Sequence, residues 1–286
     1  MRFSEGGHHM RGRVDALLVI AEAEVRAAIA ARVVQVFGGL FAVLAIAIAV
    51  AGLGASGQLL VQGFTRTGVS LLMLSLYLLP LLGLVTGAGA FGTEHGGTEL
   101  LLAQPISRST VFLGRSLGLA VVIASVGIAG LGVAGAVVAA SAGTAGIAGY
   151  AAVMAGSVAV GIAALALGIL IGVVARRRSA AVGIALAVWF CLAVLYDFVA
   201  IAILQFVGNG EPGPLLVGLL AANPIDGIRA LLLTVLGADV LLGPTGASVE
   251  RLFGPGGGAA VILASLLLAL VAPLLAARAL FGRRDF

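Results

Sequence analysis

The segment Val69–Ala90 reads VSLLMLSLYLLPLLGLVTGAGA, an apolar run of 22 residues without a charged side chain. A bilayer core about 30 Å thick needs roughly 20 mostly apolar residues to be crossed by a helix. The run therefore predicts a membrane-spanning helix, because a helix bonds its backbone polar groups internally and lipid offers them no partner. Pro80 lies inside the run and predicts a kink.

The rest of the chain repeats this pattern. Five further stretches qualify as spans: Val36–Leu53, Leu117–Ala140, Tyr150–Val174, Ala180–Val207 and Ala259–Phe281, the last containing Pro273. The chain is 61% hydrophobic and only 10% charged, whereas soluble domains are about 45–50% apolar and about 25% charged. We predict an all-α polytopic membrane protein, with an N-terminal part over 1–35 and a six-span domain over 36–286.

The basic residues define an orientation. All 16 are arginine. If the N-terminus is cytoplasmic, 13 of them fall on the cytoplasmic side: in the two terminal segments and in the second and fourth loops between spans. The outer segments hold the other three, Arg66, Arg229 and Arg251. Because arginine accumulates in cytoplasmic loops, we expect a plasma-membrane protein with both termini cytoplasmic. The positive net charge thus reflects topology, and we expect no nucleic-acid partner.

Two segments outside the spans have helical signals. Asp15–Arg32 places Asp15, Glu22 and Arg26 on one stripe, with the latter two at i,i+4 spacing, and we expect an amphipathic helix along the inner membrane surface. The outer segment 208–258 contains Asn223, a cap residue, before Pro224 and Asp226, which favour the first helical turn. This outer helix, which includes Arg229, should run to about Leu236, end at Gly237 and lie near the outer interface.

The loop between the second and third spans carries the most specific signal. Gly96 and Gly97 break the preceding span, Thr98 can cap a short helix, Glu99 complements its dipole, and Pro105 ends it before Ser107 caps the next span. Leu100 to Leu102 give the short helix an apolar surface, and a short apolar helix docks readily into a groove. The alternatives are a docking element for a partner protein and an interfacial turn without one.

Asp197 is the one acidic residue clearly inside a span. Acidic groups at membrane depth are costly and mark functional sites often. Two interpretations stay open: an interhelical or interfacial polar contact, and a place on a cargo path or gate.

The loop pattern resembles the coupling-helix region of ABC transporter permeases of the exporter-like type-two class. The residues that carry this resemblance are Glu94, Gly96, Gly97, Thr98, Glu99, Leu100, Leu101, Pro105 and Arg108, followed by Gly114 and Arg115. The resemblance implies six spans per subunit, two copies per transporter and separate ATPase subunits that dock on this loop. It also implies that the chain itself is not catalytic and holds no cofactor.

A closer resemblance is to the permeases that serve maturation of nitrous oxide reductase. It is carried by residues in several loops and spans: Ala55–Gln58, Gly96–Thr98, Ser179–Ala181, Val188–Phe190, Asp197, Asn223, Pro224, Asp226 and Arg229. This implies an extracytoplasmic accessory protein, contacted by the outer helix, and delivery of a sulfur species for the copper–sulfide centre. The chain departs from the pattern in its all-arginine basic set and its longer outer loop after Ala238.

The residues themselves agree with a non-catalytic subunit. A GxxxxGK[ST] phosphate loop needs its lysine, and this chain contains none. The alternatives are an ABC exporter of another cargo, an ion-coupled transporter or channel, and an intramembrane enzyme. Ion-coupled transporters usually pair ionisable groups within the spans, and the predicted spans contain no histidine.

We expect no metal site. Copper carriers use Cys, Met and His ligands, and the predicted spans offer only Met73, Met154 and Cys191, on three different helices without repeated spacing. Cys191 lies in an apolar run and is expected to pack.

Site-directed labelling tests the orientation. In a Cys191→Ser background, Gly57→Cys and Gly210→Cys should react with a membrane-impermeant thiol reagent added outside, whereas Ser179→Cys should react only after the membrane is opened. The opposite pattern would overturn the arginine-based topology.

Overall fold

A computed structural model describes residues 5–54, 63–92, 107–175, 177–206, 213–238 and 257–283, and every regular element in these ranges is a helix. Six segments are long and apolar enough to cross a membrane. They comprise α2 (Arg32–Gly54), α3 (Gly63–Phe91), α5 (Arg108–Ala142), α6 (Ile147–Val174), the run Arg178–Gln205, and α12 (Gly257–Arg283). The predicted all-α, six-span architecture is therefore confirmed. α3 and α12 continue through Pro80 and Pro273.

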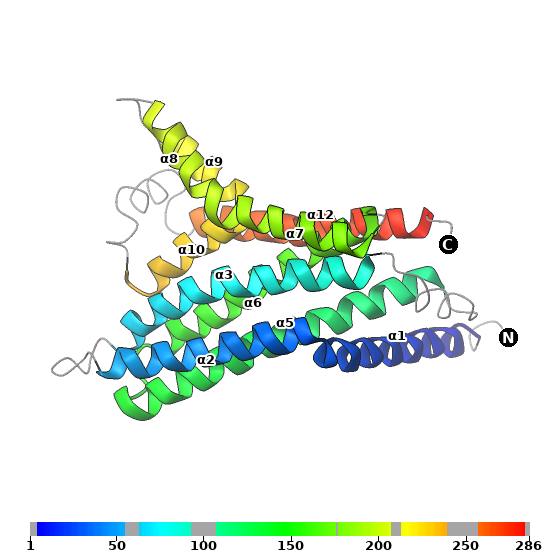
Figure 1. Cartoon of the computed structure of the whole chain (residues 1–286), viewed down its shortest axis with the longest axis horizontal. Coiled ribbons are helices and arrows are strands. Elements are labelled where there is room, and N and C mark those ends of the chain that lie inside the picture. The colour runs from blue at the N-terminus through cyan, green and yellow to red at the C-terminus, as the bar shows by residue number, and fades with distance from the viewer. Residues whose placement is uncertain are drawn as a thin grey trace.

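The spans form an elongated bundle (Figure 1). The beginning of α1 (Glu5–Ala30) and the end of α12 lie at the same end of this bundle. We call it the terminal end, and we call the other the far end. An even number of spans requires this arrangement of the two terminal helices.

α1 packs alongside the first half of α5. Ile20, Ala21 and Ala28 are its buried residues in this contact region. The backbones approach closely because α5 has glycines on the contact face: a Cβ at Gly114 would lie 2.9 Å from Ile20, and one at Gly118 would lie 2.6 Å from the Ala21 carbonyl oxygen. The predicted Glu22–Arg26 ion pair is formed and is exposed. α1 is thus held by a helix of the bundle along part of its length.

α3 and α6 form the tightest contact of the bundle. A Cβ at Gly83 would lie 2.4 Å from the Gly161 carbonyl oxygen, and a Cβ at Gly168 would lie 2.4 Å from that of Leu84. Small residues permit such close packing of helices in membranes, where dispersion contacts replace the hydrophobic effect as the driving force. Between these buried backbones, Ser75 and Ser157 share a hydrogen bond of 2.7 Å.

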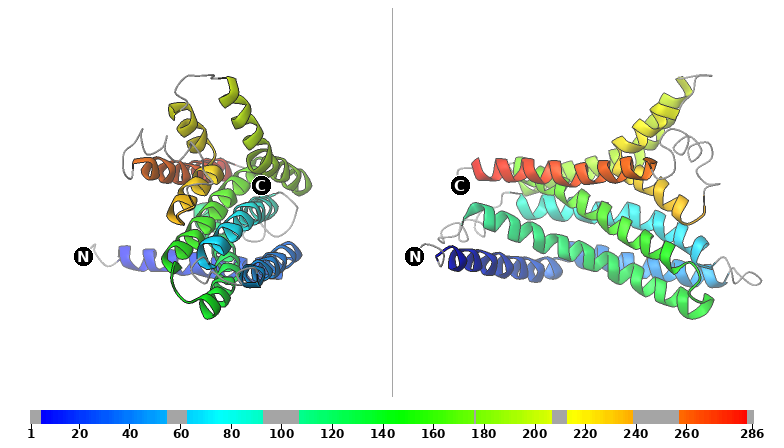
Figure 2. Two further views of the ribbon diagram at one scale, coloured as in Figure 1. Left: turned by 90° about the vertical axis from the view of Figure 1, so that its left-hand side faces the viewer. Right: turned by 180° about the vertical axis from the view of Figure 1, so that it is seen from behind.

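The fifth span is not a uniform helix. α7 (Arg178–Phe190) passes into a π-helical segment, η2 (Cys191–Leu195), and then into α8 (Tyr196–Phe206). α8 leaves the bundle together with α9 (Gly213–Ala222), as both views show (Figures 1 and 2). Cys191 begins the π-helical segment and is exposed on the single chain, so the expectation that it packs inside the chain is wrong.

α9 and α10 (Pro224–Val235) meet at an angle of 111°. The predicted cap is confirmed: the Asn223 side chain accepts a hydrogen bond from the Ile225 amide at 3.1 Å, and Pro224 is the first helical residue. Gly237 ends α10 at φ +66°, where the Ala238 amide donates to the Leu233 carbonyl. This is the Schellman ending that favours glycine.

The structure places α10 more deeply in the protein than the sequence suggests. Ile228, Leu232 and Leu233 are buried in a cluster with residues of α3, α6 and α12. We expected a helix near the outer interface; the structure shows that it packs against three helices of the bundle, and its depth in the membrane stays a prediction. The reason is that Ile225, Ile228, Leu232 and Leu233 share one broad apolar face, whose burial against several neighbours is favourable.

Substitution of Gly168 tests the α3–α6 contact. Gly168→Ala should reduce the free energy of unfolding by about 1–3 kcal/mol, because the new methyl group overlaps the Leu84 backbone. Gly132→Ala on α5 is the matched control, since a Cβ at Gly132 meets nothing within 4 Å. Thermal unfolding in one detergent should show a lower midpoint for the first variant only. Equal midpoints would show that the helices are less closely packed than described.

Candidate functional site

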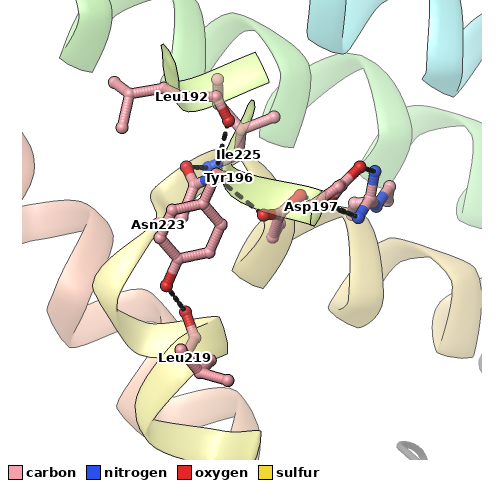
Figure 3. Close-up of polar contacts among 8 residues, drawn as sticks. Leu192, Tyr196, Asp197, Leu219, Asn223 and Ile225 are labelled. Atoms are coloured by element: carbon pink, nitrogen blue, oxygen red, sulfur yellow. Dashed lines mark hydrogen bonds and ion pairs between the residues drawn. The ribbon is translucent and has the colours of Figure 1, made fainter. Parts of the chain in front are cut away.

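An ion pair joins α8 to α10 at the far end of the bundle. The two terminal nitrogens of Arg229 donate to the two carboxylate oxygens of Asp197 at 2.9 and 3.2 Å (Figure 3). A planar guanidinium and a carboxylate are matched for such two-point binding. Asp197 lies in the first turn of α8, directly after the π-helical segment. The pair therefore fixes α8 relative to α10 across a break in the fifth span.

The same arginine holds a second carboxylate. Arg229 Nη2 lies 2.8 Å from Asp226 Oδ1 on the preceding turn of α10, and the Asp226 side chain is only 7% exposed. Asn223 Nδ2 donates to the other Asp226 oxygen at 2.8 Å and is also 2.8 Å from the Leu192 carbonyl oxygen of the π-helical segment. The cap residue of α10 thus contacts the π-helical segment as well as its own helix (Figure 3).

Two further hydrogen bonds position the broken span. The Tyr196 hydroxyl donates to the Leu219 carbonyl of α9 at 2.6 Å, and Trp189 Nε1 donates to the Tyr77 carbonyl of α3 at 3.0 Å. Each donor belongs to an amphipathic aromatic side chain whose ring packs while its polar atom bonds. These residues attach the fifth span on either side of its π-helical segment.

The network borders a cavity of about 470 Å³ between α8, α9 and α10. Asp197, Asp226 and Arg229 line one part of it, Tyr196 and Met73 adjoin them, and the remaining lining residues are leucine, isoleucine and alanine. Two carboxylates face one guanidinium, so the fully ionised network carries one excess negative charge. The cavity can therefore hold an apolar or neutral group beside a polar wall, and it disfavours a free anion.

The sequence singled out the residues of this network but did not predict that they contact one another. It assigned Asp197 to a span and Asn223, Pro224, Asp226 and Arg229 to an outer segment, and the structure brings the four polar side chains into one network. Two predicted roles change: Asn223 and Asp226 are 0% and 5% exposed, so they cannot present a surface to an outer partner. The sequence assigned no role to Tyr196 or the Leu192 carbonyl, and Trp189 was named only as part of the resemblance. The opposite charges of Asp197 and Arg229 in apolar surroundings were the available signal.

The predicted coupling loop lies largely outside the described residues. This applies to Glu94, Gly96, Gly97, Thr98, Glu99, Leu100, Leu101 and Pro105, so their docking role stays a prediction. The described part confirms that Ser107 caps α5, since its hydroxyl accepts from the Thr110 amide at 3.2 Å. Arg108 is the first residue of α5 and donates to the Gly282 carbonyl of α12 at 3.4 Å.

An aromatic and ionic cluster supports both ends of this loop. The rings of Phe91, Phe112 and Phe281 have centroids 5.4–6.0 Å apart and join the end of α3 to α5 and α12. The Arg115 guanidinium lies 4.9 Å from the centre of the Phe91 ring, a cation–π distance.

Arg115 also links α1 to the end of α3. Its Nε donates to Glu24 at 3.0 Å and its Nη2 donates to the Ala90 carbonyl at 2.7 Å. The two charged side chains are only 13% and 16% exposed. Breaking such a pair leaves a poorly hydrated charge, so this contact holds α1, α3 and α5 in one arrangement beside the loop.

Among the described residues, no group of three or more His, Cys, Asp or Glu side chains could hold a metal ion. Met73 and Met154 pack in two different apolar clusters. The chemistry available at the far end is therefore that of carboxylates, a guanidinium and hydroxyl groups.

Six candidate spans, a bent helix pair between the fifth and sixth, and polar residues that join broken helices define a polytopic membrane protein. The chain belongs to the ABC-2 transporter family: it matches the family described as "ABC-2 family transporter protein" over residues 18–286. The chain is a permease component of an ABC transporter.

Two relatives share a substantial part of the sequence. Both are named "Probable ABC transporter permease protein NosY", one from Stutzerimonas stutzeri and one from Pseudomonas aeruginosa. Each is 33% identical over 199 residues, which cover 67% of this chain and 72% of the relative. The similarity agrees with the resemblance to a permease subfamily found in the sequence.

Arg229→Leu and Asp197→Asn should have unequal effects. Arg229→Leu leaves the buried Asp226 carboxylate without its cation and should destabilise the protein by about 3 kcal/mol. Asp197→Asn removes a half-exposed charge and should cost about 1 kcal/mol or less, while lowering transport if Asp197 acts as a gate. Thermal unfolding and transporter-dependent activity measure the two effects.

Arg26→Leu is the control, because its ion pair with Glu22 is exposed and should contribute little. If Arg229→Leu unfolds at the temperature of the control, the network does not stabilise the far end. Normal transport in a stable Asp197→Asn variant would favour the purely structural interpretation.

Proposed function

We propose that the chain is the membrane subunit of a transporter that supports assembly of the copper–sulfide centre of nitrous oxide reductase, driven by a separate ATPase subunit. The observation that carries the proposal is the similarity to two NosY permeases over 67% of the chain. It coincides with the subfamily resemblance carried by Gly96–Thr98, Asp197 and Asn223.

A separate ATPase subunit is required if the transporter uses ATP, because this chain has no lysine for a phosphate loop. We propose that it docks on residues 93–106, between α3 and α5. The Phe91–Phe112–Phe281 cluster and Arg115 lie at the base of that segment. A force applied to the loop would reach α1, α3, α5 and α12 together through these contacts.

We propose a sulfur species as cargo, and not copper. The soft side chains of the spans do not converge: Met73 borders the far-end cavity, Met154 packs in another cluster, and Cys191 is exposed. A carrier of copper would need several such ligands together. Since the fully ionised network leaves one excess negative charge on the cavity wall, we expect the sulfur to pass this region in a neutral form.

A second copy of the chain and an outer accessory protein complete the proposed assembly. The fifth span leaves large apolar side chains uncovered, with Phe198 67%, Val199 52% and Ile201 56% exposed. Lipid covers some of this surface, and a second copy is proposed to cover the part where α8 and α9 leave the bundle. Because Asn223 and Asp226 are buried, contact with the accessory protein falls to other parts of the outer segment.

An ABC exporter of another, more apolar cargo is the second candidate. The lining of the far-end cavity favours it, since most of the residues that surround the cavity are aliphatic. A strain that lacks the chain distinguishes the two candidates: loss of the copper–sulfide centre from purified nitrous oxide reductase supports the first, and an intact centre supports the second.

Leu101→Asp tests the docking site. It introduces a charge into an apolar contact without a partner and should abolish binding of the ATPase subunit. Copurification through a tag on the permease, with quantification of the ATPase subunit, measures the effect.

Glu99→Ala is the companion variant and should weaken coupling without abolishing binding, because it removes only a helix-dipole contribution of about 0.3–1 kcal/mol. Full retention of the ATPase subunit by a membrane-inserted Leu101→Asp permease would place docking elsewhere on the chain.

A further inference from the structure

A second, narrower groove lies between α5, α6 and α12, with a volume of about 190 Å³. Its walls are almost entirely apolar and include Leu113 and Leu117 of α5, Ile162 and Ile169 of α6, and Leu270 and Leu274 of α12. The shape follows from sequence spacing, since Leu113, Ser116, Leu117 and Ala120 recur at helical intervals and share one face of α5. Leu270 and Leu274 do the same on α12.

The terminal end of this groove is basic. Arg278 follows Leu274 by one helical turn on α12, and its Nε donates to the Ser109 hydroxyl of α5 at 3.0 Å. Arg108 begins α5, and Arg283 ends α12. Three arginines therefore lie on the two helix ends that enclose the groove, and Arg278 lies about 12 Å along α12 from Leu270 at 1.5 Å per helical residue.

Ser116 lies on the wall of the groove and is 7% exposed. Its hydroxyl oxygen is enclosed by the protein and has no hydrogen-bond partner in the described part of the chain. The groove wall along this serine is therefore apolar, which suits a hydrocarbon chain.

We infer that this groove binds an anionic phospholipid of the cytoplasmic leaflet. One acyl chain lies along Leu113, Leu117 and Leu274, and the phosphate lies at Arg278 with Arg108 beside it. The orientation derived from the arginine distribution puts this basic end in the cytoplasmic leaflet, where anionic lipids meet basic pockets between spanning helices. A soluble anion would leave the apolar groove empty, whereas an anionic lipid matches both the groove and the arginines at its end.

The position of the lipid gives it a structural role. Arg108 and Ser109 directly follow the proposed docking segment, and Phe112 of the same turn belongs to the aromatic cluster at its base. A bound lipid would connect the ends of α5 and α12, which the chain joins only through side-chain contacts here. The inference concerns lipid binding and does not depend on the identity of the cargo.

Native mass spectrometry of the purified full-length permease tests the inference, with palmitoyl-oleoyl phosphatidylglycerol and phosphatidylcholine as probes. Phosphatidylglycerol should remain bound and raise the unfolding temperature. Phosphatidylcholine should bind more weakly and raise the unfolding temperature less. Arg278→Gln should lower phosphatidylglycerol affinity roughly fivefold, the equivalent of about 1 kcal/mol per arginine. Ala120→Leu should fill the groove and reduce binding of both lipids.

Each variant has a control on an exposed position. Arg32→Gln removes an exposed arginine at the start of α2, away from the groove, and Ala136→Leu enlarges an exposed alanine of α5. Both variants should bind phosphatidylglycerol as the parent does. Equal binding of the two lipids, unaffected by Arg278→Gln, would overturn the headgroup assignment. Unchanged lipid binding by Ala120→Leu would overturn the groove assignment.

A second copy of the chain in the groove would also contradict the inference. In a Cys191→Ser background, Leu117→Cys should remain uncrosslinked between copies. A disulfide-linked dimer at this position would show that protein, and not lipid, covers the groove.

Discussion

The close approach of α3 and α6 is the constraint on which the rest of the structure depends. Gly83 and Gly168 leave room for the partner helix's carbonyl groups. In lipid, the van der Waals contacts of such close packing drive helix association, because the hydrophobic effect does not act between helices there. α10 rests on this pair at the far end, and the Phe91 cluster extends from its other end. Both candidate functional regions are thus attached to one rigid pair of helices.

The helices are held together by different interactions at the two ends of the bundle. At the terminal end, aromatic rings and the Arg115–Glu24 pair join four helices around the base of the docking segment. At the far end, Arg229 binds two carboxylates from two helices, and a π-helical segment lets α8 depart from the bundle. π-Helical turns are frequently found at functional sites. A motion transmitted along α3 and α6 would therefore reach a helix junction made of charged contacts.

The sequence was sufficient for the spans because length and hydropathy are local properties that lipid enforces strongly. It was also sufficient for the caps at Ser107 and Asn223, which depend on neighbouring residues. It could not place α10, because burial against α3, α6 and α12 depends on tertiary packing. The Asp197–Arg229 pair joins residues 32 positions apart, and the π-helical segment has no sequence signature in a run as uniformly apolar as Cys191–Leu195.

ATP hydrolysis by the complex purified through a tag on this chain tests the central claim most directly. The account predicts that a distinct ATPase subunit copurifies in a fixed ratio and hydrolyses ATP with inhibition by vanadate, and that cargo movement in liposomes requires this hydrolysis. A stable permease that carries its cargo without an ATPase subunit, driven by an ion gradient, would contradict it.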